Sequence, residues 1–324
     1  MRSGETIRSI DYLQNRAKVD KERIGNPGVT GKNPEKEENK MKEILMKQIK
    51  GTRTIEFLFS ADLEVELHPN EDPARGVHTD TVLKEILKEV RGEGKYTNSS
   101  PPSFILFNGD TDARYDKKYR DIWEQLESLC PCYYVFGNHE CGFFDNDANK
   151  WRRYHGYQET YYSWEYFHKG TTITFIVLDT WCAQEGKSLK CYHPGTGGQI
   201  FREEEKQWLK EILDKAPGLT IVFAHAHMWC PPKGRTQDNK EVDELLKILK
   251  GTYEEGKIHR SANIFFNGGH HDYPSCEKVE GIYFIDPLAG IHKAYARVII
   301  DPINKKMDYI GRFNEKSYLN LNLS

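Results

Sequence analysis

Side chains that can hold a metal ion recur at the ends of apolar, strand-like stretches of this sequence. The stretch at 134–136 is followed almost at once by Asn138 and His139. An Asn amide oxygen can bind a metal, and an adjacent imidazole can protonate a leaving group. Four other strand-like stretches are followed by residues of the same kinds: Asp62 and Glu64, Asp110, His225, and His270 with Asp272. This repetition predicts one composite site rather than five unrelated loops.

Helices alternate with these strands in the order needed to bring the strand ends together. The segments with helical spacing of apolar residues are 79–90, a segment capped by Asp116, 202–215 and 241–249. A strand–helix–strand order favours a parallel sheet, in which ligands collect at the carboxyl ends of the strands. Later strands at 282–285 and 294–300, with a return over 307–312, predict an antiparallel finish.

Composition excludes several classes of partner and location. The 324-residue chain has a formal net charge of -3, so no general attraction for nucleic acid or anionic membranes is expected. No apolar run is long enough to span a bilayer and no secretory signal is evident, so we expect a cytoplasmic protein. The seven cysteines include no Cys-x-x-Cys pair. Most are expected to be small buried residues, although Cys182 and Cys191 could pair in an oxidising compartment.

Residues 1–50 differ from the rest of the chain. This segment is charged and interrupted by Gly and Pro, with short amphipathic patterns at Ile7, Ile10 and Leu13 and again over 41–49. We expect an N-terminal extension that is partly helical or flexible and that could dock a protein partner. The folded domain is then expected to cover residues 51–324.

Taken together, the motifs resemble those of the calcineurin-like metallophosphoesterases over roughly residues 54–300. The matching motifs are Asp62-Leu63-Glu64, Gly109-Asp110, Gly137-Asn138-His139-Glu140, His225 and Gly269-His270-His271-Asp272. Segments 161–164, 175–180 and 222–225 are similar to the branch with purple-acid-phosphatase-like and cyclic-nucleotide-phosphodiesterase-like members. The resemblance implies an α/β fold (α+β by some schemes), a four-layer αββα sandwich of two mixed β-sheets flanked by helices.

The same resemblance implies a binuclear metal centre between the sheets. Asp110 would bridge two divalent ions, with Asn138, His225 and His270 completing one site and Asp62, Glu64 and Asp272 the other. A metal-bound hydroxide would attack a phosphate ester in line, and His139 would protonate the leaving oxygen as the general acid, with Asp112 as the candidate that orients it.

Departures from the family pattern concern the first metal site. Glu64 and Asp272 stand where the family has His, which leaves a carboxylate-rich site that favours Mn²⁺ or Mg²⁺, whereas Zn²⁺ or iron suits the His-containing site. Ala113 replaces the tyrosinate ligand of purple acid phosphatases. A second alignment places Gly269 at the first late His of the family and His271 at the second, so the late ligands are either His270 and Asp272 or His271.

Two functions of different classes follow. The first is a metal-dependent phosphoesterase acting on a small phosphorylated substrate, either a phosphomonoester or a phosphodiester. The second is a catalytically impaired relative that serves as a binding or scaffold protein, an alternative that rests on the altered Glu64 and Asp272. The retained residues argue against it and favour the enzyme; they are Asp62, Asp110, Asn138, His139 and His225. The segment Trp151-Arg152-Arg153-Tyr154 could hold a phosphate and stack a base, or could form a solvated helix face with buried rings.

Overall fold

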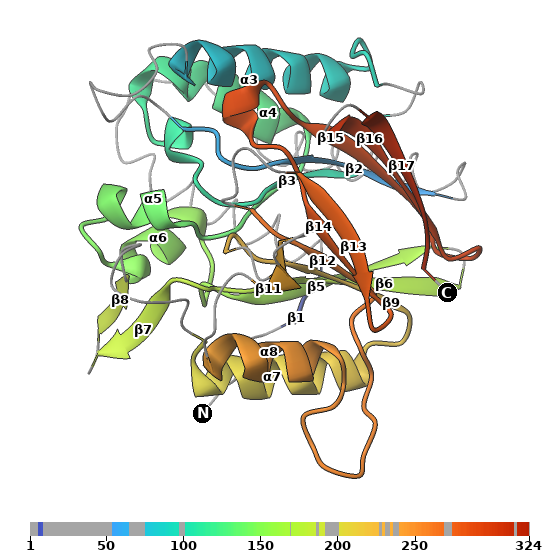
Figure 1. Cartoon of the computed structure of the whole chain (residues 1–324). Coiled ribbons are helices and arrows are strands. Elements are labelled where there is room, and N and C mark those ends of the chain that lie inside the picture. Colours follow the sequence, from blue (N-terminus) through green and yellow to red (C-terminus); the bar gives the residue numbers. More distant parts are fainter. Residues whose placement is uncertain are drawn as a thin grey trace.

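Two β-sheets packed face to face, with helices on both outer faces, make up the protein in the computed structural model (Figure 1). The residues that the structure describes are 6–8, 54–64, 75–96, 101–168, 170–185, 188–191, 201–226, 229–230, 234–235, 240–268, 274–313 and 316–323. This arrangement confirms the αββα sandwich expected from the sequence.

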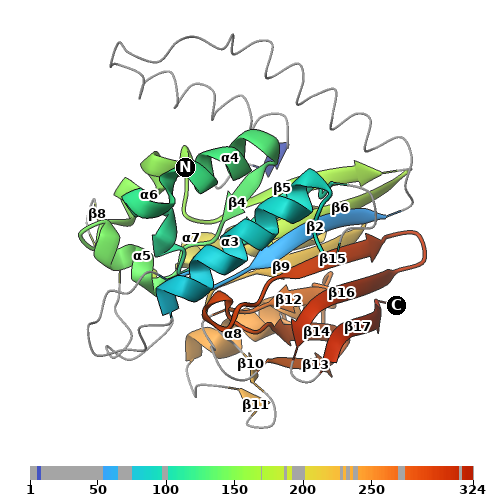
Figure 2. The same ribbon diagram turned by 90° about the horizontal axis from the view of Figure 1, so that it is seen from above.

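The first sheet has six strands in the order β17-β16-β15-β2-β3-β4. Strands β2, β3 and β4 are parallel, and β15, β16 and β17 extend the sheet in antiparallel fashion. The strands are β2 (Ile55–Ser60), β3 (Phe104–Phe107), β4 (Cys132–Tyr134), β15 (Ala296–Asp301), β16 (Lys306–Phe313) and β17 (Lys316–Asn322). Helices α3 (Arg75–Arg91) and α4 (Arg120–Leu129) connect the parallel strands and cover the outer face of this sheet (Figure 2).

The second sheet has seven strands in the order β1-β5-β6-β9-β12-β14-β13. Its four central strands, β6, β9, β12 and β14, are parallel. The strands are β1 (Thr6–Arg8), β5 (Tyr162–His168), β6 (Thr171–Val177), β9 (Leu219–Phe223), β12 (Ile264–Phe266), β13 (Ser275–Val279) and β14 (Ile282–Asp286). Helices α7 (Glu203–Lys215) and α8 (Lys240–Leu249) lie on its outer face (Figure 1).

Shorter elements surround the strand ends. Helices α5 (Asn138–Phe143) and α6 (Ala148–His155) follow β4 directly. Two small hairpins are formed by β7 (Cys182–Glu185) with β8 (Ser188–Cys191) and by β10 (Trp229–Cys230) with β11 (Gly234–Arg235). No helix among the described residues combines the length and apolarity needed to cross a membrane.

Aromatic side chains fill the space between the two sheets. Phe57 of β2 stacks on Phe104 of β3 at 4.7 Å and meets Phe175 of β6 edge-on at 5.9 Å. Tyr133 of β4 stacks on Trp164 of β5 with ring centroids 3.9 Å apart. All five residues are at most 3% exposed. Because such rings bury large apolar areas, this shared core holds the sheets in fixed register and therefore fixes the position of the strand ends.

Most predicted elements are present, and the differences have local causes. The helix expected to begin at Thr79 or Asp80 begins at Arg75, and the Thr79 hydroxyl donates instead to the Glu64 carbonyl, at 2.8 Å. The strand expected over 134–136 ends at Tyr134, since Gly137 caps α5, which begins at Asn138. The spacing of apolar residues in the sequence predicts that Leu129 lies on the buried side of α4, but Leu129 is 44% exposed, so the buried side ends before it.

Two corrections concern segments expected to be helix or loop. Ile7 lies in β1, which pairs with β5, so the helix expected to include it is wrong at that residue. The Gly-rich, Cys-containing segment 181–200, which the sequence predicts to be a loop, contains the β7–β8 hairpin, in which Cys182 lies opposite Cys191. Residues 9–53 lie outside the described residues, and the domain boundary near residue 50 stays a prediction.

A buried ion pair links the first sheet to helix α3. Nε of Arg297 on β15 donates to the Glu56 carboxylate at 2.7 Å, and Nη1 lies 3.6 Å from the Glu89 carboxylate. Arg297 and Glu89 are fully buried. The same Glu89 accepts hydrogen bonds from the Tyr96 backbone and the Tyr295 hydroxyl. The positive charge of Arg297 therefore offsets part of the free-energy cost of burying the Glu89 carboxylate.

We expect Arg297→Met to lower the free energy of unfolding by about 3–5 kcal/mol, because removing one partner leaves a buried charge uncompensated. Urea unfolding measures the loss. Lys84→Met is the control, since Lys84 forms an exposed pair with Asp80, for which about 0.5 kcal/mol is typical. Equal losses in the two variants would contradict a structural role for the buried pair.

Candidate metal centre

Two aspartates with left-handed backbone conformations lie at the centre of the site. Asp62, just beyond β2, has φ 55°, and Asp110, just beyond β3, has φ 49°. The Asp62 N–H donates to the Gly109 carbonyl at 3.0 Å, and the Asn108 N–H donates to the Ser60 carbonyl at 2.8 Å. The two strand ends are therefore tied to each other, and their carboxylates lie in one buried region.

Glu140 of α5 holds the backbone around Asp110 in place. One of its carboxylate oxygens accepts hydrogen bonds from the N–H groups of Asp110 and Gly137, both at 3.0 Å. The other accepts from the Thr111 N–H at 2.7 Å and from the Thr111 hydroxyl at 2.8 Å. Burial and the nearby charge of Asp110 raise the pKa of Glu140. Four donors on one fully buried carboxylate join the ends of β3 and β4.

His225, beyond β9, approaches the aspartates from the second sheet. Its Nδ1 lies 2.8 Å from the Asn108 carbonyl, which can only accept, so Nδ1 carries a hydrogen and Nε2 faces the carboxylates. Nε2 lies 3.1 Å from Oδ2 of Asp110 and 3.9 Å from Oδ1 of Asp62. A Cβ at Gly109 would lie 2.4 Å from the ring, so the close approach requires glycine there.

The electrostatics of the pair Asp110 and His225 are strongly coupled. Burial alone would lower the pKa of His225, but the charges of Asp110 and Asp62 and the hydrogen bonds raise it to about 10. Burial would raise the pKa of Asp110, but His225 and His139 hold it below its usual range. Because a metal-binding imidazole must be neutral, cation binding at Nε2 of His225 would release any proton held there.

His139 and Glu64 lie on the other side of Asp110. Nε2 of His139 is 3.9 Å from both Oε1 of Glu64 and Oδ2 of Asp110, and the His139 N–H donates to Oδ1 of Asp110 at 2.8 Å. The separation of 4.0 Å between Nδ1 of His139 and Oδ2 of Asp112 is longer than a hydrogen bond. The His139 side chain is 25% exposed, whereas Asp62, Glu64 and Asp110 are at most 2% exposed.

These side chains form two groups of ligand atoms that share one residue. Asp62, Asp110 and His225 make one group, and Glu64, Asp110 and His139 make the other, with the ligand atoms of each group within 4.8 Å of one another. Carboxylate oxygens and imidazole nitrogens suit divalent cations such as Mn²⁺, Zn²⁺ or Fe²⁺. The donor set therefore fits the expected metals, and the shared Asp110 is where a bridging ligand would be.

The grouping differs in two respects from the partition expected from the sequence. Asp62 lies with His225 rather than apart from it, and His139, expected as an acid, lies within the second group. Asn138 is half-buried at the start of α5, next to His139. His270 and Asp272, and the alternative ligand His271, lie outside the described residues, so their placement stays a prediction.

A buried charge network that was not predicted from the sequence supports the region around His225. Arg202 donates to the Thr160 hydroxyl at 2.8 Å and lies 3.3 Å from the Asp179 carboxylate, while the Asp179 N–H donates to Glu205 at 2.8 Å. The adjoining Thr180 hydroxyl accepts from the Ala226 N–H at 3.2 Å. In the sequence, the feature that could have identified this network is the position of Asp179 at the end of a strand, next to His225 in the parallel sheet.

The comparisons with known proteins agree with this geometry. The family model described as calcineurin-like phosphoesterase matches residues 57–273, more than half of the chain. No curated protein sequence matches the chain.

The solved structures that match this chain have low sequence identity to it. TT1561 from Thermus thermophilus is 13% identical with a TM-score of 0.42, covering 84% of this chain and 100% of that one. Vps29 from Chaetomium thermophilum is 12% identical with a TM-score of 0.32, covering 82% of this chain and 91% of that one. At these values the likeness says nothing about activity.

We expect Glu140→Gln to destabilise the protein by about 2–3 kcal/mol, because an amide presents N–H groups to donors that now face a carboxylate oxygen. Metal content should fall in the same variant, since the backbone of Asp110 loses its support. Urea unfolding and elemental mass spectrometry measure the two effects. Glu85→Gln, at an exposed partner of Lys88, should change neither. Unchanged stability and metal content in Glu140→Gln would show that the carboxylate is not needed.

Proposed function

Because the chain belongs to the calcineurin-like phosphoesterase family, we propose that it is a hydrolase that cleaves a phosphate ester with two divalent cations. The observation that supports the proposal most directly is the position of Asp110, whose carboxylate is shared by both ligand groups. Bound cations would act as Lewis acids on the phosphate and would lower the pKa of a coordinated water. Asp62 and His225 would hold one cation, and Glu64 with Asp110 would contribute to the other.

His139 is proposed to donate a proton to the leaving oxygen. A general acid must contact both the buried site and the substrate, and His139 is the most exposed side chain in the two ligand groups. Three carboxylates, those of Glu64, Asp110 and Asp112, lie within 4.0 Å of its ring nitrogens. These carboxylates can orient the ring toward a bound substrate.

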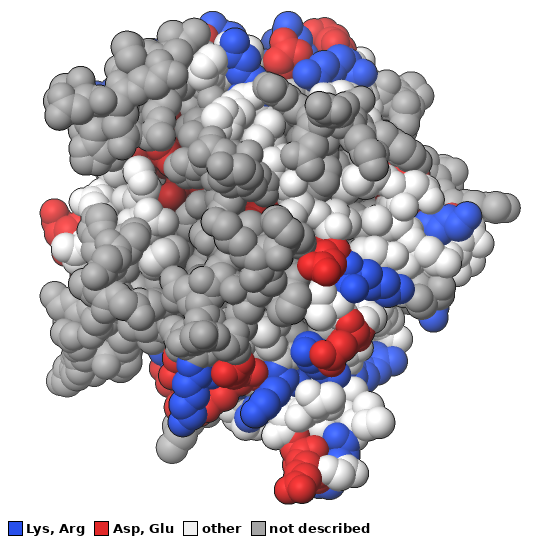
Figure 3. Space-filling model, viewed as in Figure 1, with Lys and Arg blue, Asp and Glu red and all other residues white. Residues whose placement is uncertain are grey.

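A small phosphorylated substrate fits the described surface better than a polyanion. Lys and Arg alternate with Asp and Glu over the face drawn in Figure 3, both along α3 and along α7 and α8. In α6, Trp151 is buried, Arg152 lies 3.3 Å from the Glu159 carboxylate, and Arg153 lies 3.9 Å from that of Asp147. These arginines have acidic partners, so the solvated-face interpretation of residues 151–154 is favoured over a phosphate-binding role.

The first experiment measures metal content by elemental mass spectrometry and turnover of p-nitrophenyl phosphate and bis-p-nitrophenyl phosphate with Mn²⁺, Mg²⁺ or Zn²⁺. We expect about two metals per chain and hydrolysis of at least one ester. Hydrolysis of only the monoester or only the diester would define the substrate class. Absence of both metal and turnover would contradict the proposed hydrolase and favour the binding or scaffold function.

Two site variants separate proton donation from metal binding. His139→Ala should keep its metals and lower kcat for phenyl phosphate by about 10²–10⁴-fold, with a much smaller loss for p-nitrophenyl phosphate, whose stable leaving group needs no proton. Asp110→Asn should lose metal from both sites and lose activity on both esters. His259→Ala is the matched control, since His259 has a similarly buried side chain and contacts Asp214 and Glu254 on α7 and the segment after α8.

One result of these assays would contradict the role of His139 as the general acid. If His139→Ala lowers turnover of both esters by the same factor and also reduces metal content, His139 is a metal ligand and not the acid.

A further inference from the structure

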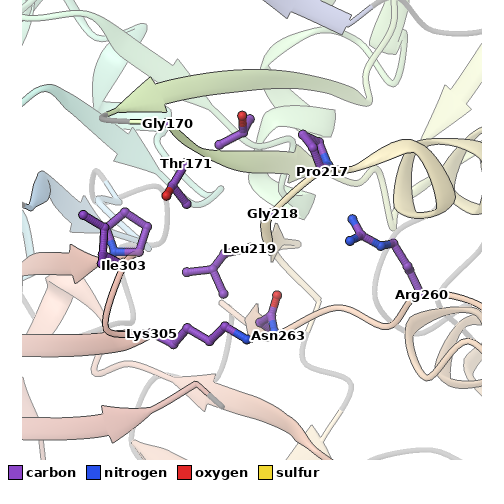
Figure 4. Close-up of a pocket in the computed structure, with 11 residues that line it drawn as sticks. Gly170, Thr171, Pro217, Gly218, Leu219, Arg260, Asn263, Ile303 and Lys305 are labelled. Atoms are coloured by element: carbon purple, nitrogen blue, oxygen red, sulfur yellow. The ribbon is translucent and has the colours of Figure 1, made fainter.

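A pocket whose lining includes none of the metal ligands lies between the two sheets (Figure 4). It is formed where β6, β9 and β12 begin and where the turn between β15 and β16 approaches them. Its volume is about 480 Å³, within the range of small-molecule sites. The residues that matter for its chemistry are Thr171, Leu219, Arg260, Asn263, Ile303 and Lys305.

The pocket is separate from the metal centre. Leu219 begins β9, and His225 follows the same strand six residues later. At a rise of about 3.3 Å per residue, the two positions are roughly 20 Å apart. The parallel course of β6, β9 and β12 places all of their first residues at this end and their carboxyl ends at the other.

Two cationic side chains are directed into the pocket. Figure 4 shows the Arg260 guanidinium pointing toward Gly218 and the Lys305 side chain running beneath Leu219 toward Asn263. Both residues are exposed. Within the described part of the chain, neither side chain forms an ion pair, and the pocket lining includes no Asp or Glu. The lining therefore carries two positive charges with no acidic residue to balance them.

The polar side chains of the pocket add further donors. The Asn263 amide oxygen accepts from the Thr220 N–H at 2.8 Å and from its hydroxyl at 3.3 Å. This fixes the amide orientation and leaves the Asn263 NH₂ group facing the Lys305 ammonium (Figure 4). Thr171 and Thr172 of β6 belong to the same lining. Donors thus surround the space from several elements, which suits an oxyanion.

The backbone that carries these groups is held in place. A Cβ at Gly218 would lie 1.9 Å from the Thr172 carbonyl oxygen, so only glycine allows the residue before β9 to approach β6 so closely. In the β15–β16 turn, one oxygen of the Asp301 carboxylate accepts from the N–H groups of Ile303 and Asn304, at 3.1 and 3.0 Å. The Lys305 carbonyl accepts from the Leu323 N–H at 2.7 Å. The backbone around these groups is thus held in place before any ligand binds.

We propose that this pocket binds a small organic molecule with a phosphate-type dianion, independently of the metal centre. The charge of -2 matches the two uncompensated cations, and the tetrahedral oxyanion can accept from Arg260, Lys305 and Asn263 together. Leu219 and the half-exposed Ile303 provide an apolar surface for the organic part of the ligand. Phosphate is favoured over a single carboxylate because it takes more donors and carries the second charge.

Isothermal titration with phenylphosphonate tests this proposal, because the probe is a dianion with an apolar ring and contains no ester to hydrolyse. Titrations use the full chain with Mn²⁺ and again with a chelator, so that any binding at the metal centre is removed. We expect saturable binding of one probe that survives chelation. Arg260→Ala/Lys305→Ala should weaken it about 100-fold or more, because both charged hydrogen-bond donors are removed.

Lys215→Ala/Lys240→Ala is the matched control, because it removes the same charge from exposed positions on α7 and α8. The affinity of this control variant for phenylphosphonate should equal that of the parent chain. Equal weakening in the two double variants would mean general charge attraction and would overturn the proposal. Loss of all binding with the chelator would assign the probe to the metal centre and would also overturn it, as would no saturable binding at all.

Discussion

Mutual repulsion among buried carboxylates is the constraint on which the site depends. Asp62, Glu64, Asp110 and Asp112 are each at most 2% exposed and lie around the same two imidazoles. Four such groups can be buried together only if positive charge enters with them. A protonated His225 would provide part of that charge: burial lowers its pKa, but Asp110 and Asp62 raise it to about 10. Divalent cations would provide more, and the site is therefore built to gain stability from them.

Part of the free-energy cost of this site is conformational strain in the backbone. Asp62 and Asp110 both adopt left-handed conformations, for which a non-glycine residue costs about 1–3 kcal/mol. Two sets of hydrogen bonds offset this strain. The Asp62 N–H donates to the Gly109 carbonyl, and the Asp110 N–H donates to the Glu140 carboxylate. The core between the sheets supplies the rigid frame, since strand ends that could slide would not keep His225 at 3.1 Å from Asp110.

The sequence predicts the strands that carry the site, because their apolar runs are continuous and each is followed by a polar ligand. The run 104–107 is an example, and it forms β3 with all four residues buried. Strand β13 was missed because Ser275–Val279 is a polar edge strand, recognisable only from its pairing with β14. The resemblance placed Glu140 in a motif, but its role depends on donors about 30 residues away in the chain. Similarly, the local sequence does not indicate that Arg202 pairs with Asp179, because the two residues meet only when β6 and α7 pack together.

The measurement that tests the bridging role of Asp110 most directly is electron paramagnetic resonance of the chain loaded with Mn²⁺. If one carboxylate joins two ions about 3.5–4 Å apart, the spectrum should show two spin-coupled Mn²⁺ ions, and Asp110→Asn should convert what remains bound to an uncoupled signal. A fully loaded parent chain that shows only isolated Mn²⁺ would contradict a binuclear centre built on Asp110.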